Sequence, residues 1–183
     1  HRKSPYDAVE NAIGARIVDY LTKPVNPSQI LLVCKKVLQR KQIAGERISR
    51  DYSSEFSQIA GRILGAMEWK DWVDVHLTLC EYDLELDQHP DLGLKQTLYD
   101  QKRDCNTEFG RYIEKNYSQW LFSDERPPLS VDVFKNYVKP HIDRGHRAIL
   151  VVIDNMRLDQ WLVLEPLLRD YFRINRDYYF SIL

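Results

Sequence analysis

The sequence predicts a mixed α/β, helix-rich protein in which a long helical region lies between two segments that each contain short strands. Apolar residues recur every three or four positions from residue 39 to about residue 123, which is the spacing of amphipathic helices. Short runs rich in β-branched residues occur on both sides, at residues 17–22 and 149–153. These runs predict α/β units at both ends of the chain.

The composition is that of an ordinary globular protein. The 183 residues are 44% hydrophobic and 29% charged, with a formal net charge of -1 at pH 7. This balance predicts no clear nucleic-acid patch, because such a surface normally has a basic excess. No apolar run approaches the roughly 20 residues of a membrane span. Cys34, Cys80 and Cys105 lie in apolar patterns, which predicts buried, reduced thiols in a cytoplasmic protein.

The N-terminal segment is expected to form a helix, a strand and a second helix. Residues 4–14 have a helical pattern that stops at a glycine. The strand at residues 17–22 ends before Pro24, because proline has no N–H to donate to a strand ladder. The next helix begins after Ser28 and is predicted to continue through Lys41, which would make a stiff connection.

This segment, with Asp-Tyr-Leu-Thr-Lys-Pro-Val-Asn-Pro at residues 19–27, resembles the last third of the receiver domain of two-component response regulators. The resemblance implies that Lys23 contacts a phosphoryl group on an aspartate elsewhere. It also implies that Tyr20 is the switch aromatic and that the bond before Pro24 is a cis-peptide candidate. Without the resemblance, Lys23 and Pro24 are a loop dipeptide and Tyr20 is a strand aromatic.

The receiver resemblance also implies partners. They are a sensor histidine kinase and a second copy of the chain, bound as a homodimer through the helix-strand-helix face. The first strands of a receiver, with the phosphoacceptor aspartate and the ligands of Mg²⁺, are absent from this sequence. The chain as written is therefore not expected to accept a phosphoryl group.

The middle of the chain is expected to be a helical bundle that connects the two ends. Residues 54–67, 68–82 and 92–121 each place apolar side chains on one helix face. Aromatic residues at this spacing are interpreted as core. A linker at residues 123–128 follows, and then a short helix from Ser130 that is expected to end at Pro140.

The apolar run at residues 149–153 stops abruptly at Asp154. This pattern predicts a strand buried on both faces, followed by a helix at residues 155–170 and a second strand at residues 178–182. Asp154 has two interpretations. It either caps the helix that follows or lies at the sheet edge where ligands and metals bind.

The residues from Val152 to Trp161 resemble the opening strand of the PglZ domain, a branch of the alkaline-phosphatase superfamily. The resemblance implies that Asp154 is a ligand of a two-metal site, usually zinc, of the kind that supports phosphoryl transfer. Arg157 and Asp159 match the motif but receive no role. The nucleophile and the other ligands would lie beyond Leu183, so no catalytic residue is expected within this chain.

The two resemblances predict three regions: the end of a receiver at residues 1–38, a helical connector at 39–145 and the start of a PglZ domain at 146–183. Such response regulators occur in Bacteroidetes and are linked to gliding and type IX secretion. The implied function is a response regulator whose output domain is a metal-dependent phosphatase or phosphodiesterase acting on a phosphoester or nucleotide.

Two alternatives stay open. One is a non-catalytic signalling protein that binds partners through the receiver face and the connector. The other is a helical α/β protein unrelated to signalling. The missing initiating Met suggests a truncated chain.

Overall fold

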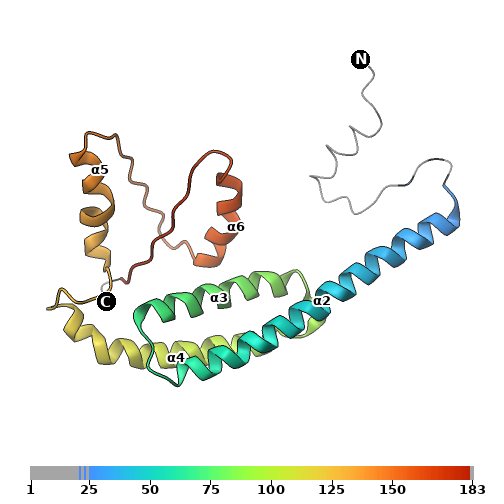
Figure 1. Cartoon of the computed structure of the whole chain (residues 1–183), viewed down its shortest axis with the longest axis horizontal. Helices are drawn as coiled ribbons and strands as arrows, with labels where there is room; N and C mark the ends of the chain where they lie inside the picture. The colour runs from blue at the N-terminus through green and yellow to red at the C-terminus, as the bar shows by residue number, and fades with distance from the viewer. Residues whose placement is uncertain (1–20, 22, 24, 182–183) are drawn as a thin grey trace, which may run out of the picture. The chain divides into compact units, whose positions relative to one another are not determined.

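The computed structural model describes residues 21, 23 and 25–181. The chain divides into two compact units, residues 1–51 and 52–183. The α-helices are Pro27–Ile63 (α2), Trp69–Asp87 (α3), Lys95–Trp120 (α4), Lys139–Asp143 (α5) and Leu158–Leu168 (α6) (Figure 1). Short helical turns occur at Pro90–Leu92 (η1), Ser130–Asp132 (η2) and Phe134–Val138 (η3).

In the first unit, the described structure consists mainly of the beginning of α2. Asn26 starts this helix, because its Oδ1 accepts a hydrogen bond of 2.9 Å from the backbone N–H of Ser28. The prediction that the helix continues through Lys41 is confirmed. Cys34, predicted to be buried, is exposed. The predicted elements at residues 4–14 and 17–22 lie outside the described residues, except Leu21.

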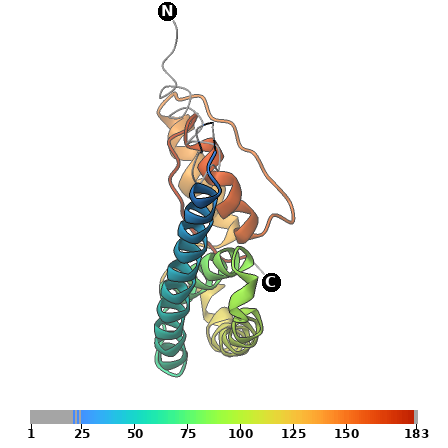
Figure 2. The ribbon, with the colours of Figure 1, turned by 90° about the vertical axis from the view of Figure 1, so that its right-hand side faces the viewer.

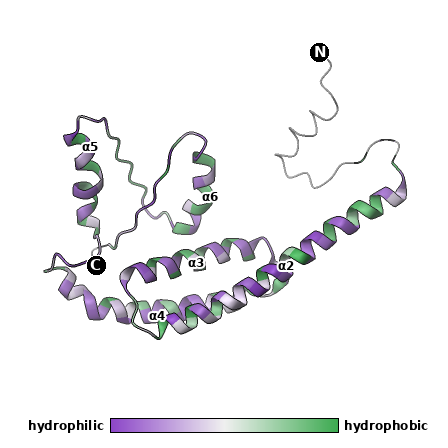
Figure 3. Ribbon diagram, in the orientation of Figure 1, coloured by the Kyte–Doolittle hydropathy of each residue, from purple (hydrophilic) through white to green (hydrophobic). Residues whose placement is uncertain are grey.

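The second unit is built on α3 and α4, which lie side by side (Figures 1 and 2). The part of α2 that belongs to this unit packs on them, with the rings of Tyr52 and Tyr82 5.2 Å apart. Hydrophobic and hydrophilic residues follow one another in short groups along α3 and α4, which is typical of amphipathic helices (Figure 3). The buried side chains include Tyr52, Ile59, Trp72, Val75, Leu79, Cys80, Leu86, Leu98, Gln101, Cys105 and Trp120.

The predicted helices of the middle region are confirmed in kind, with different ends. The helix predicted at residues 54–67 is the end of α2, and the helix predicted at 68–82 extends to Asp87 as α3. The helix predicted from residue 92 begins at Lys95, because η1 comes first and ends at Gly93. Gly93 has a φ of 67°, a left-handed conformation that glycine adopts without strain.

The helix predicted from Ser130 to Pro140 is divided into η2, η3 and α5. Pro140 does not end it. This residue lies in the first turn of α5, where a missing N–H removes no intrahelical hydrogen bond. The predicted helix at residues 155–170 is present as α6, which packs against α3.

The predicted α/β fold class is wrong: the described part of the chain is helical and contains no sheet. Residues 149–153 form neither helix nor strand, and their side chains are 55–90% exposed. The apolar run is a local signal, whereas a strand needs a partner for its N–H and C=O groups. No such partner lies beside this segment in the described residues.

The second predicted strand, at residues 178–182, is reduced to one parallel bridge between Phe180 and Leu129. The N–H of Phe180 donates to the carbonyl of Pro128 at 2.9 Å, and the N–H of Ser130 donates to the carbonyl of Phe180 at 2.8 Å. The C-terminal segment therefore pairs with the loop after α4 and not with residues 149–153.

Among the helices of the described residues, none is both long enough and apolar enough to cross a membrane.

Candidate functional site

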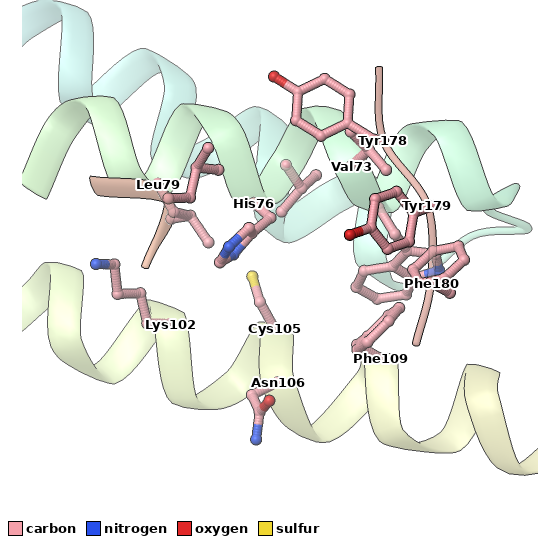
Figure 4. A pocket seen from close by; sticks show the side chains of 13 residues that line it. Val73, His76, Leu79, Lys102, Cys105, Asn106, Phe109, Tyr178, Tyr179 and Phe180 are labelled. Carbon is pink, nitrogen blue, oxygen red and sulfur yellow. The ribbon is translucent and has the colours of Figure 1, made fainter. Parts of the chain in front are cut away.

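A cavity of about 560 Å³ lies in the second unit, between α3, α4 and the C-terminal segment (Figure 4). It is lined by Trp72, Val73, Val75, His76, Leu79, Lys102, Cys105, Asn106, Phe109, Leu158, Tyr178, Tyr179 and Phe180. The lining residues of α3 and α4 recur every three or four positions, so each helix turns one face toward the cavity. The cavity is hence a product of two amphipathic helices and one non-helical segment.

Aromatic rings form one end of the cavity. The ring centroid of Phe180 lies 5.8 Å from that of Phe109 and 5.6 Å from that of Trp120, in stacked arrangements. The indole of Trp72 lies 5.4 Å from the ring of Phe109. Such pairs contribute about 0.5–1.5 kcal/mol each beyond the area that they bury. This cluster fixes the C-terminal segment on the helices.

The indole N–H of Trp72 is buried, and no atom of the described residues accepts a hydrogen bond from it. Trp72 itself is only 6% exposed. Buried indole N–H groups usually have a partner, because an unpaired one loses its hydrogen bond to water.

His76 and the Cys105 thiol also line the cavity, and Cys80 lies next to His76 on α3. Partial burial and the nearby Lys102 ammonium lower the pKa of His76, and the Asp159 carboxylate opposes this shift. The Nε2 atom of His76 is 3.8 Å from the Sγ atom of Cys80. Burial raises the pKa of Cys105 to about 11, which keeps this thiol protonated and unreactive.

The Lys102 ammonium is already paired. Its Nζ atom donates to Asp83 Oδ2 at 2.5 Å, and Asp83 also accepts a hydrogen bond from Lys95. Lys95 in turn pairs with Asp87 at 2.7 Å. Burial raises the pKa of Asp83, but the hydrogen bonds from Lys102 and Lys95 outweigh it and lower the pKa overall. The cavity consequently has no unpaired cation in its described lining for a strongly anionic ligand.

A buried hydrogen-bonded group outside the cavity lining joins α2 to α4. The Tyr52 hydroxyl donates to Gln101 Oε1 at 3.2 Å, and Gln101 Nε2 donates to the carbonyl of Phe56 at 3.1 Å. Burial raises the pKa of Tyr52 to about 12. This arrangement sets the position of the helices and offers no reactive group.

The residues predicted from the sequence lie elsewhere. Lys23 is exposed, and Tyr20 and Pro24 are outside the described residues. Asp154 is exposed, and its Oδ1 accepts a hydrogen bond of 2.9 Å from the N–H of Asn155. The interpretation of Asp154 as a helix cap is wrong, because α6 begins at Leu158.

In the described part of the chain, Asp154 belongs to no cluster of metal-binding side chains. Among the described residues, no group of three or more His, Cys, Asp or Glu side chains could hold a metal ion. Arg157 and Asp159, which match the PglZ motif, form an ion pair with each other at 2.7 Å. None of these residues lines the cavity.

A comparison with known protein families identifies the centre of the chain. Residues 42–121 match the PorX response regulator linker domain. The matched region begins within α2 and includes all of α3, η1 and α4. The assignment to response regulators, which the receiver resemblance had predicted, is thereby supported for the helical region. No curated protein matches the chain.

The region that matches the PorX linker contains two walls of the cavity but not the third. The two helical walls of the cavity, α3 and α4, lie inside residues 42–121. The other lining residues, Leu158 and residues 178–180, come after this matched region. The sequence predicted the apolar faces of residues 68–82 and 92–121, which supply the helical lining, only as core. Their three- and four-residue spacing is the same for a filled core and for a cavity wall, so no local signal could have distinguished the two.

Proposed function

We propose that this chain is the central part of a PorX-like response regulator that acts in type IX secretion. Its linker would pass the state of a receiver to an output region. The observation that carries this proposal is the match of residues 42–121 to the PorX linker domain. The receiver-like sequence at residues 19–27 supports it, because it stands directly before α2. A sensor histidine kinase would phosphorylate the receiver, with Mg²⁺ as cofactor.

The proposal predicts that transmission depends on the rotational phase of α2. Two alanines inserted between Arg40 and Lys41 would rotate the flanking parts of the helix by about 200° relative to each other. Seven inserted residues would leave them within about 20° of the original phase. We expect the two-residue insertion in the full-length protein to abolish secretion of a type IX cargo in the source bacterium.

The seven-residue insertion is the matched control, because it lengthens the helix without changing its phase. It should retain secretion. Immunoblots must show equal amounts of both proteins. Normal secretion with both insertions would argue against transmission through α2.

We further propose, from the PglZ resemblance of residues 152–161, that the output region is a zinc-dependent phosphatase or phosphodiesterase with Asp154 as one ligand. Asp154 by itself does not form a zinc site, and activity would depend on ligands outside the described residues. Zinc bound there would stabilise the charge of a phosphoryl transfer. The Asp154 carboxylate is exposed, so a zinc ion can reach it.

The test of this second proposal is the zinc content and phosphodiesterase activity of the full-length protein. Asp154→Ala should lower zinc occupancy and hydrolysis of bis(p-nitrophenyl) phosphate, whereas Asp170→Ala, at another exposed carboxylate, should change neither. Wild-type zinc and hydrolysis in Asp154→Ala would contradict the ligand role.

The alternative is a non-catalytic protein that binds partners. The exposed apolar side chains of residues 149–153 favour it, because a contiguous exposed apolar segment is typical of an interaction surface. A full-length protein without zinc and without hydrolytic activity would support this alternative.

A further inference from the structure

We propose that the C-terminal segment at residues 176–181, called the latch from here on, is released from α3 and α4 while these helices stay folded. Release uncovers a site on the helices that binds the phenylalanine of this extended segment. The two sides of the contact differ, because the rest of the fold holds the site in place and few contacts hold the latch. This inference goes beyond the proposed signalling function and does not depend on it.

Three aromatic rings of α3 and α4 form the site for the Phe180 side chain. The Phe180 ring stacks on those of Phe109 and Trp120, with centroid distances of 5.8 and 5.6 Å. Trp69 lies in an edge-to-face arrangement with the same ring, at 6.3 Å. Phe109 and Phe180 lie beside each other in Figure 4. Stacked and edge-to-face neighbours favour a flat aromatic side chain over an aliphatic one.

The loop at residues 126–132 pairs with the backbone of Phe180 and has contacts of its own. Residues 128 and 130 form two backbone hydrogen bonds with Phe180, at 2.9 and 2.8 Å. Inside the loop, the Asp132 carboxylate accepts hydrogen bonds from the N–H of Leu129 at 2.9 Å and from the guanidinium of Arg126 at 3.0 Å. Neither of these two contacts involves the latch, so we expect the loop to keep its shape after release. Paired backbone of this kind selects an extended segment.

The latch itself lies mostly on the surface. Between the end of α6 and Phe180, the backbone is neither helix nor strand. The side chains of Phe172 and Tyr179 are 64% and 50% exposed. An ion pair of 3.2 Å joins Arg176 to Glu165 of α6. Segments with few buried side chains and an exposed backbone open at a lower free energy than the core beside them.

The helices have a core that does not include the latch. Leu86 of α3 and Leu98 of α4 are each 1% exposed, and the buried hydrogen bond between Tyr52 and Gln101 joins α2 to α4. The match to the PorX linker domain ends at residue 121, so the latch is not part of the matched unit. Release of the latch therefore leaves the contacts among α2, α3 and α4 in place.

Native-state hydrogen exchange of the ¹⁵N-labelled chain tests the release. The N–H groups of Phe180 and Ser130 should exchange at least about 100-fold faster than those of Leu79 and Cys105, inside α3 and α4. Their exchange should not depend on dilute urea, because opening the latch exposes little surface. Phe180→Ala should raise the exchange rate of Ser130 at least tenfold, whereas Phe172→Ala, in the exposed part of the segment, should leave it unchanged.

A peptide with the sequence of residues 175–181 tests the site. It should shift the amide signal of Ser130 in the Phe180→Ala chain, where the place of the ring is free. The same peptide with alanine at the position of Phe180 should cause no shift. The wild-type chain should bind the first peptide at least tenfold more weakly, because its own latch competes as part of the same molecule.

Three results would overturn the inference. One is exchange of Phe180 and Ser130 at the rate and urea dependence of Leu79, which would mean that the latch opens only when the helices unfold. Another is loss of the helices in Phe180→Ala, measured by circular dichroism. The third is peptide binding that is absent in folded Phe180→Ala or equally strong in the wild type.

Discussion

The Tyr52 hydroxyl is the clearest case in which one polar atom determines how helices fit together. Its acceptor, Gln101 Oε1, belongs to a side chain that is itself buried and that donates to the carbonyl of Phe56. Removing the hydroxyl would leave Gln101 Oε1 without this donor in a place that water does not reach. Buried polar groups in this situation are costly to leave unpaired.

We therefore expect Tyr52→Phe to lower the free energy of unfolding by about 1–2 kcal/mol. Urea denaturation followed by circular dichroism measures this change. Tyr99→Phe is the matched control, because Tyr99 lies on α4 and is 64% exposed, and its loss should be within about 0.5 kcal/mol. Equal effects of the two substitutions would show that the Tyr52 hydrogen bond does not matter for stability.

Alkaline pH should destabilise the protein through Tyr52 and Cys105. Burial raises their pKa values to about 12 and about 11 in the folded state, from 10.0 and 9.0. A raised pKa contributes stability below the unfolded value, and that contribution is lost as the pH rises through the folded value. Stability should hence fall from about pH 9 to pH 12.

The contribution of Tyr52 to this loss can be isolated in Tyr52→Phe, which cannot ionise there. Its unfolding free energy should decline less steeply than that of the wild type between pH 10 and pH 12. Chemical denaturation at a series of pH values measures both slopes. Parallel curves would indicate that Tyr52 has the same pKa in the folded and unfolded chains.

At the scale of elements, one glycine lies inside a helix and another lies at the end of a helical turn. Gly110 lies inside α4, and a Cβ atom added there would contact nothing within 4 Å. Gly93 ends η1 with a φ of 67°, where an L side chain is strained. The same substitution should thus have opposite effects at the two positions.

Gly110→Ala should stabilise the protein by about 0.5–1 kcal/mol, because alanine loses less backbone entropy in a helix. Gly93→Ala should destabilise it by about 1 kcal/mol or more, because of the left-handed conformation. Thermal unfolding of both variants beside the wild type measures the difference. A loss of stability in Gly110→Ala would mean that α4 is more closely covered there than the structure shows.

At the scale of the whole molecule, the burial of residues 149–153 distinguishes the predicted sheet from the observed helical fold. Val152 would be in the middle of a buried strand in the first case, and it is 80% exposed in the structure. Val152→Asp should cost less than about 0.5 kcal/mol, as most exposed substitutions do. In a buried strand the unpaired carboxylate would cost several kcal/mol. Urea denaturation of this variant decides between the two.

A matched control for Val152→Asp is Val75→Asp. Val75 is a buried valine of α3, 2% exposed. This substitution should unfold the protein or lower its stability by several kcal/mol, because a charge cannot be buried without a partner. A large loss of stability in Val152→Asp as well would mean that the segment is covered in solution.

The positions of the helices could be predicted because helical periodicity is a local property. Residues such as Trp72, Val75 and Leu79 on α3 repeat the spacing of one helix face, whatever they pack against. Their ends were less predictable. The pattern predicts that Pro140 ends a helix, yet Pro140 lies in the first turn of α5, because the first turn of a helix accepts proline.

The sequence by itself determined the central helices and their apolar faces, and it predicted the response-regulator assignment that the PorX linker match supports. Only the tertiary structure decided that residues 149–153 have no strand partner in the described chain and that Phe180 stacks on Trp120. It also decided that α3, α4 and residues 178–180 enclose a cavity. The physical reason is that strand pairing, ring stacking and enclosure join residues far apart in sequence, whereas amphipathic spacing is present in each helix alone.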